Sequence, residues 1–179
     1  MIPTPARILL ADDHALVRTG LRMILDAEPD LQVVAEAADG YEALEALAGT
    51  PTDLAILDIA MPRMTGLQSA REIQRLHPHV RILILSMYDN EQYFFEAIKA
   101  GASGYVLKSV ADRDLLEACR AAMRGEPFFY PGAITAKGWG FQDALFKGKA
   151  FEFERGFGSY VMENILFKVS HPAEFHGQT

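Results

Sequence analysis

The sequence predicts an α/β fold in which a doubly wound, five-stranded parallel sheet carries helices on both faces. Five short apolar segments alternate along the chain with five segments whose apolar residues recur at helical spacing, and this alternation is typical of a parallel sheet covered by helices. The central segment, Leu54 to Asp58, is apolar until its last residue, as expected of a strand buried on both faces. Because crossover connections are right-handed, few topologies remain.

The first part of this predicted domain contains two strands and two helices before the central strand. The first strand is a short apolar run that delivers Asp12 and Asp13 to its carboxyl end. The helix after it places leucines and isoleucine at helical spacing, and Pro29 ends it. The expected elements are a strand at 7–11, a helix at 15–27, a strand at 31–37 and a helix at 40–48.

The second part follows the central strand and repeats the same alternation. Pro78 closes the third helix, and the glycine-containing turn 101–104 leads into the last strand. The final helix carries leucines, a cysteine and a methionine on one side. The expected elements are a helix at 65–76, a strand at 81–85, a helix at 91–100, a strand at 105–107 and a helix at 111–123.

Composition limits the class of protein. The chain has 179 residues, half of them hydrophobic, which is enough for one core of ordinary size. No apolar run approaches the roughly 20 residues that span a bilayer, and the first residues lack the pattern of a signal peptide. The single cysteine, Cys119, agrees with a reducing compartment. A cytoplasmic protein that does not enter a membrane is therefore expected.

Charge is unevenly distributed. The net charge of −7 lies entirely in residues 1–131, whereas residues 132–179 are neutral. Binding to nucleic acid normally requires a basic patch. The sequence therefore predicts no contact of this chain with nucleic acid.

Polar side chains with complementary chemistry follow four of the predicted strands. Singly, Asp13 is explained as a helix cap, Ser86 as a turn residue and Lys108 as a surface charge. Together they meet at the carboxyl edge of the sheet, where ligands bind in open α/β folds. Several carboxylates in one pocket repel one another unless a cation lies among them, and few oxygen ligands favour Mg²⁺. The predicted group is Asp12, Asp13, Asp58, Ser86 and Lys108.

These residues resemble the receiver domain of two-component response regulators. The resemblance rests on the strand-end residues, on Met61-Pro62 and Gly66 after Asp58, and on the segment 101–108. The resemblance covers about residues 5–130, and the sequence is most similar to the NarL/FixJ branch of the family. It implies a flavodoxin-like (CheY-like) fold with strand order 2-1-3-4-5, and a receiver domain at 1–130.

The resemblance also implies the roles of individual residues. Asp58 would accept a phosphoryl group from a sensor histidine kinase, and Lys108 would pair with that group. Ser86 would turn toward it while Tyr105 swings inward, which changes the surface of the fourth helix, fifth strand and fifth helix. Mg²⁺ would be bound by Asp13, Asp58 and the backbone carbonyl of Ala60, and Asp12 would help to hold it mainly through water.

The expected protein is a phosphoacceptor and not an enzyme. Ala60 has no side chain that could position a water for hydrolysis, and the bulky Tyr88 flanks the pocket. Autodephosphorylation is therefore expected to be slow.

The composition changes after Gly125, where nine of the eleven phenylalanines and the only tryptophan lie. The helix-turn-helix pattern that normally follows a NarL/FixJ receiver is not recognised there. Instead, residues 134–179 resemble an internal stretch of 2-methylcitrate dehydratase (MmgE/PrpD family). We expect residues 131–179 to form an aromatic-rich appendage without its own core and without dehydratase activity.

Three functional hypotheses follow. The first is a phospho-accepting signalling module that acts through a partner, with a homodimer as one candidate because the aromatic appendage offers an association surface. The second is an inactive dehydratase fragment fused to a receiver. The third is a receiver that cannot be phosphorylated and serves as a binding scaffold.

Overall fold

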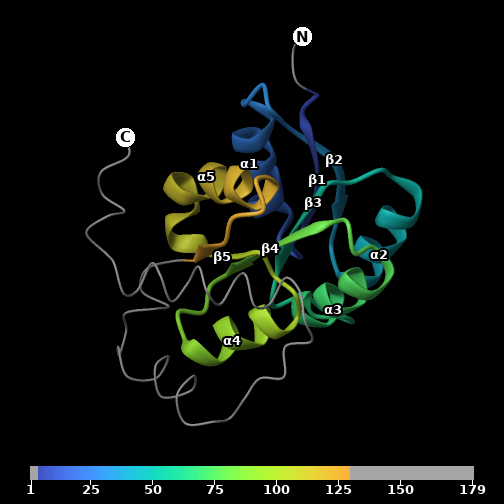
Figure 1. Ribbon diagram of the computed structural model, residues 1–179, viewed down its shortest axis with the longest axis vertical. Coiled ribbons are helices and arrows are strands. Elements are labelled where there is room, and N and C mark those ends of the chain that lie inside the picture. The colour runs from blue at the N-terminus through green and yellow to red at the C-terminus, as the bar shows by residue number, and fades with distance from the viewer. Residues whose placement is uncertain (1–3, 130–179) are drawn as a thin grey trace. The chain divides into compact units, whose positions relative to one another are not determined.

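The computed structural model describes residues 4–129 (Figure 1). The order of elements in this part is the predicted alternation of strands and helices. The strands are β1 (Ala6–Ala11), β2 (Leu31–Ala37), β3 (Leu54–Asp58), β4 (Arg81–Ser86), β5 (Gly104–Leu107) and β6 (Phe128–Phe129). The helices are α1 (Ala15–Asp26), α2 (Gly40–Gly49), α3 (Gly66–Leu76), α4 (Glu91–Lys99), a 3₁₀ turn (Lys108–Val110) and α5 (Ala111–Met123).

The described strands form one sheet with the order β2-β1-β3-β4-β5-β6. The pairs from β2 to β5 are parallel, so the flavodoxin-like, CheY-like order 2-1-3-4-5 is confirmed. The prediction of five strands was incomplete, since β6 extends the sheet beyond β5 and the Phe128 amide donates to the Ser103 carbonyl at 3.3 Å. Two residues are too few for an apolar run to predict a strand.

Helices cover both faces of the sheet. On one face α1 and α5 pack against strand residues in a single hydrophobic cluster, which includes Leu25 and Leu115 from the helices and Ile56 from the central strand. Helices α2, α3 and α4 lie on the other side (Figure 1). Every residue of β3 is buried, because the strand has helices on both faces.

The start of α3 is held close to the end of β3. Thr65 and Gln68 form a reciprocal capping box at the amino end of α3, which satisfies otherwise unpaired amides. The Gly66 amide donates to the Ile59 carbonyl at 3.0 Å, and a β-carbon at Gly66 would overlap the carbonyl oxygen of Asp58. A glycine here is therefore needed to bring the loop against the strand end.

The predicted appendage at 131–179 lies outside the described residues, so its lack of a core and the domain boundary at 130 remain predictions. Within residues 4–129, no helix is both long and apolar enough to cross a bilayer.

Candidate phosphoacceptor and cation site

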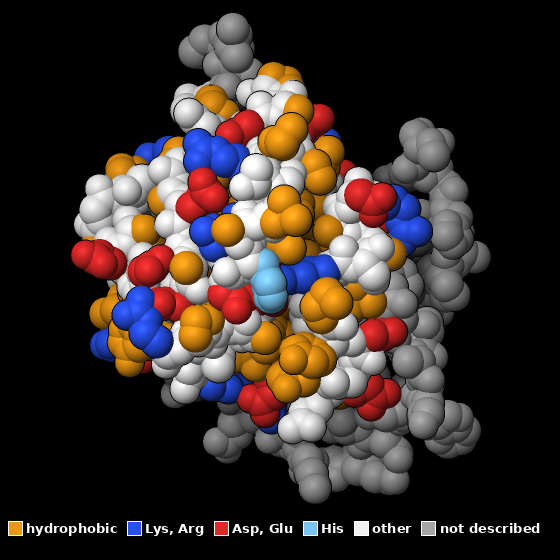
Figure 2. Space-filling model, turned by 180° about the vertical axis from the view of Figure 1, so that it is seen from behind, with side chains coloured by type: hydrophobic (Ala, Val, Ile, Leu, Met, Phe, Trp, Pro, Cys, Tyr) orange, Lys and Arg blue, Asp and Glu red, His pale blue; other side chains and the backbone are white. Residues whose placement is uncertain are grey.

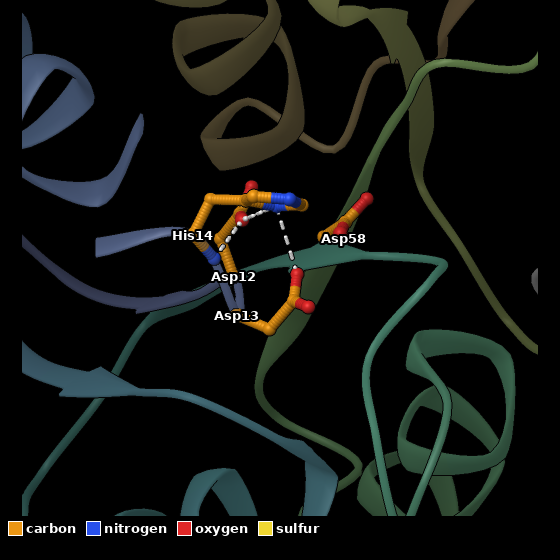
Figure 3. A group of neighbouring side chains, drawn as sticks. All are labelled: Asp12, Asp13, His14 and Asp58. Atoms are coloured by element: carbon orange, nitrogen blue, oxygen red, sulfur yellow. Dashed lines mark hydrogen bonds and ion pairs between the residues drawn. The ribbon is translucent and has the colours of Figure 1, made fainter. Parts of the chain in front are cut away.

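The register of the sheet places the ends of β1 and β3 side by side. Ala11 pairs with Leu57, so Asp12 and Asp58 follow on neighbouring strands. Figure 3 shows Asp12, Asp13 and His14 on the turn after β1, facing Asp58 at the end of β3. The predicted meeting of these three carboxylates at one sheet edge is observed.

The carboxylates and one imidazole form a compact group. One ligand atom from each of Asp12, Asp13, His14 and Asp58 lies within 4.8 Å of the others. Asp12 and Asp58 are buried, with 0% and 3% of their surface exposed, whereas Asp13 and His14 are exposed. The group therefore has a buried floor and an open, solvent-facing side.

Lys108 brings a positive charge to this group from the end of β5. Its Nζ lies 2.5 Å from Asp12 Oδ2 and 3.3 Å from Asp58 Oδ1, and its side chain is only 10% exposed. The predicted ammonium is thus in place. It offsets part of the repulsion between the carboxylates.

Burial dominates the electrostatics of Asp58. Loss of solvent raises the pKa of this carboxyl above its usual value, while the Lys108 ammonium lowers it and the Asp12 carboxylate raises it further. Asp58 is therefore held in a site that disfavours its negative charge, unless a further cation is added.

Ser86 ends β4, the strand that pairs with β3, and Tyr105 lies on β5, the next strand of the sheet. Ser86 pairs with Leu107 across the strands, and its buried Oγ accepts a hydrogen bond from the Tyr88 amide at 2.9 Å. The Tyr105 hydroxyl donates to the Tyr88 carbonyl at 2.6 Å, and the side chain is 1% exposed. Burial raises the pKa of Tyr105 to about 12.

The inward position of Tyr105 bears on the predicted switch. The family resemblance implied that this ring moves inward on phosphorylation. In the described structure the ring is already buried in the core, where it packs edge-on against Phe94. The Tyr105 hydroxyl donates to the Tyr88 carbonyl, and the Ser86 hydroxyl oxygen accepts from the Tyr88 amide. The loop between β4 and α4 is therefore coupled to both residues.

The donor set fits Mg²⁺. Three carboxylates supply hard oxygen atoms, which this cation prefers. The buried Asp12 Oδ2 faces the Lys108 ammonium at 2.5 Å. Ala60 lies two residues beyond Asp58 and is exposed, and its carbonyl as a ligand stays a prediction.

Two residues near the site were not predicted from the sequence. His14 Nδ1 lies 2.9 Å from Asp13 Oδ1 and 3.3 Å from Asp12 Oδ1, and the Arg18 guanidinium donates to the Asp12 carbonyl at 2.5 Å. The position of His14 directly after two strand-end carboxylates was an available signal. Arg18 gave no such signal, because an arginine in a helix usually faces solvent.

Exposed apolar side chains adjoin the site along the chain. Leu16 is 85% exposed just after His14, and Met87 and Tyr88, which follow Ser86, are 72% and 40% exposed. Figure 2 shows a face of the molecule on which hydrophobic side chains lie among acidic and basic ones. Such a mixed surface suits contact with another protein.

Comparison with known proteins identifies relatives of the described part. The sequence model of the response regulator receiver domain matches residues 8–120. The transcriptional regulatory protein YxjL of Bacillus subtilis is 42% identical over 123 residues, which are 69% of this chain and 56% of that protein. The chain therefore spans little more than half the length of this curated relative.

Two solved structures resemble the described fold. A LuxR-family two-component response regulator from Aurantimonas sp. SI85-9A1 is 36% identical, with a TM-score of 0.71 over 74% of this chain and 94% of that one. The RcsB response regulator of Salmonella typhimurium, in a structure concerned with DNA interaction, is 27% identical, with a TM-score of 0.68 over 73% of this chain and 65% of that one.

These comparisons bear on two expectations. The relatives include a transcriptional regulator and a protein studied for its interaction with DNA, so the absence of nucleic acid as a partner does not follow from the acidic charge of residues 1–131. The family match covers residues 8–120 and gives no support to the dehydratase resemblance of residues 134–179.

Proposed function

This chain belongs to the response regulator receiver family, and on that basis we propose that Asp58 accepts a phosphoryl group from a sensor histidine kinase. The observation that carries the proposal is the position of Asp58, a buried carboxylate that faces Asp12 and Asp13 with the Lys108 ammonium 3.3 Å away. The chemistry is group transfer to a carboxylate nucleophile.

In the proposed reaction, one carboxylate oxygen of Asp58 forms a bond to phosphorus. The bond between phosphorus and the donor histidine nitrogen breaks, and that nitrogen keeps the electron pair. Lys108 places its positive charge beside the attacking carboxylate, where it stabilises negative charge on the transferred group. Ser86 reaches the same group with its hydroxyl once that hydroxyl leaves the Tyr88 amide.

Mg²⁺ is the proposed cofactor. Asp12, Asp13, Asp58 and the Ala60 carbonyl would hold it, and when bound it would neutralise charge on the phosphoryl oxygens. The exposed side of the group, formed by Asp13 and His14, gives a cation and a phosphodonor a path of entry.

The proposed response to phosphorylation starts at Tyr88. When Ser86 turns toward the phosphoryl group, the Tyr88 amide loses its acceptor, while the Tyr88 carbonyl keeps the Tyr105 hydroxyl. The loop before α4 then repacks, and the change reaches the surface of α4, β5 and α5.

Phosphorylation is tested on the full chain with acetyl phosphate and Mg²⁺, read by intact mass. We expect a gain of one phosphoryl group, lost in Asp58→Asn and in the presence of a chelator. Asp53→Asn is the matched control, since Asp53 pairs with Arg7 at the start of β1 and should leave the gain unchanged. No gain, or one that survives Asp58→Asn, favours the scaffold hypothesis.

The proposed acyl phosphate is long-lived. Ala60 is exposed two residues beyond Asp58, and its methyl group cannot orient a water toward phosphorus. Tyr88, in the loop between β4 and α4, is a bulky side chain that is 40% exposed. Ala60→Asn supplies an amide there and should shorten the lifetime of the phosphorylated form by roughly tenfold. Equal decay in both proteins, or a lifetime of seconds in the unaltered chain, would contradict this.

A second copy of this chain is a proposed partner of the phosphorylated form. Sedimentation of the full chain with and without acetyl phosphate tests it, and residues 1–130 alone test the contribution of the appendage. Association that depends on phosphorylation supports the proposal, and a monomer under all conditions opposes it.

A further inference from the structure

The imidazole of His14 belongs to the same ligand group as the carboxylates. One of its ring nitrogens lies within 4.8 Å of a carboxylate oxygen of each of the three aspartates, and in Figure 3 the ring lies above Asp12 and Asp13. The side chain is 66% exposed. Nothing in the proposed phosphoryl transfer uses it.

The distances match neighbouring positions around an octahedral cation. Ligands bound at about 2.1 Å and at right angles lie about 3 Å apart. His14 Nδ1 is 2.9 Å from Asp13 Oδ1 and 3.3 Å from Asp12 Oδ1, so the nitrogen lies at this spacing from each of the two oxygens. The buried Asp12 Oδ2 is paired with the Lys108 ammonium at 2.5 Å, so Asp12 Oδ1 is the oxygen that faces His14.

A nitrogen donor changes which cations such a site prefers. Carboxylate and water ligands suit Mg²⁺, whereas an imidazole favours transition metals such as Co²⁺, Ni²⁺ and Zn²⁺. We infer that His14 is a nitrogen ligand of the cation site, which therefore binds divalent first-row transition metals as well as Mg²⁺. This inference rests on the proposed cation site.

A simpler role for His14 would be to orient Asp13 through a hydrogen bond. His14→Gln separates the two, because a glutamine amide donates a hydrogen bond to a carboxylate but is not a nitrogen ligand. His79→Ala is the matched control, since His79 is exposed on the loop before β4 and not in the group.

The test uses the full chain at about pH 8, where a free imidazole is neutral, with less than one equivalent of Mn²⁺. Pulsed electron paramagnetic resonance should show nitrogen coupled to the metal in the unaltered chain and in His79→Ala, and not in His14→Gln. Calorimetry should show Co²⁺ affinity on the order of tenfold lower in His14→Gln, with Mg²⁺ affinity changed less than about twofold.

The outcomes separate this inference from the proposed function. Nitrogen coupling or Co²⁺ affinity that is unchanged in His14→Gln overturns the ligand role. If Mg²⁺ still binds in that case, the cation site itself stands. Failure of the unaltered chain to bind any of these cations overturns both.

Discussion

At the scale of single residues, the site combines groups that oppose one another when no cation is bound. Asp58 has 3% of its surface exposed, and its pKa is raised first by burial and also by the carboxylate of Asp12. A buried charge is destabilising unless it is paired, and Lys108 is shared between two carboxylates. The arrangement that suits phosphoryl transfer should therefore reduce the stability of the fold.

Asp58→Asn should accordingly raise the thermal midpoint by a few degrees in the presence of a chelator. The amide keeps the shape of the side chain and removes one repelling charge, while Lys108 keeps its ion pair with Asp12. Calorimetry of the full chain measures this, with Asp53→Asn as a control expected to lower the midpoint because Asp53 pairs with Arg7 at 2.8 Å. A lower midpoint for Asp58→Asn would contradict the argument.

The sequence predicts most of the residues at this site, for one reason. Strands of a parallel sheet all end at the same edge, so residues that follow strands meet whatever their separation along the chain. Asp58 and Lys108 are found in this way. The inward position of Tyr105 and the approach of His14 depend on side-chain rotamers, and a sequence pattern contains no information on them.

At the scale of elements, two glycines with opposite surroundings test how α3 is placed. A β-carbon at Gly66 would overlap the backbone of Asp58, whereas one at Gly20 in α1 would meet nothing within 4 Å. Gly66→Ala should destabilise the fold by roughly 2 kcal/mol or more and slow phosphorylation, because the loop after Asp58 must shift. Gly20→Ala should stabilise it by about 0.5–1 kcal/mol, since alanine favours a helix interior.

Urea denaturation of both variants measures this pair, with acetyl phosphate labelling as the second readout. Unchanged labelling in Gly66→Ala, together with unchanged stability, would show that the loop yields without effect on Asp58.

The ten predicted elements follow closely from the apolar periodicity, and each of their ends lies within one residue of its predicted place. The helix 65–76, for example, begins at Gly66 with Thr65 as its cap. Strand β6 was not predicted, because its own sequence does not make it a strand. It is a strand because it pairs with Ser103 and lies beside β5. Pairing across distant segments is the part that local pattern does not contain.

At the scale of the whole molecule, ion pairs at the sheet edge opposite the site join segments that are distant in sequence. Arg7 on β1 contacts Asp53, which precedes β3, at 2.8 Å. Arg120 on α5 contacts Asp30, which precedes β2, at 2.9 Å and also Glu28. These arginines lower the pKa values of Asp53 and Asp30 through hydrogen bonds. Both carboxylates are therefore more acidic in the folded chain than in the unfolded one.

The sign of the resulting pH dependence is fixed. A carboxyl whose pKa is lowered by folding contributes stability that is present above its unfolded pKa, near 4, and is lost as the pH falls through the folded value. The fold should therefore lose stability below about pH 4, and Asp53→Asn should be less stable at neutral pH but lose less on acidification. Urea midpoints from about pH 2.5 to 7 measure this. An acid limb of equal slope in both proteins would show that the pair of Arg7 and Asp53 does not contribute to folding, because only a group whose proton affinity differs between the two states can change that slope.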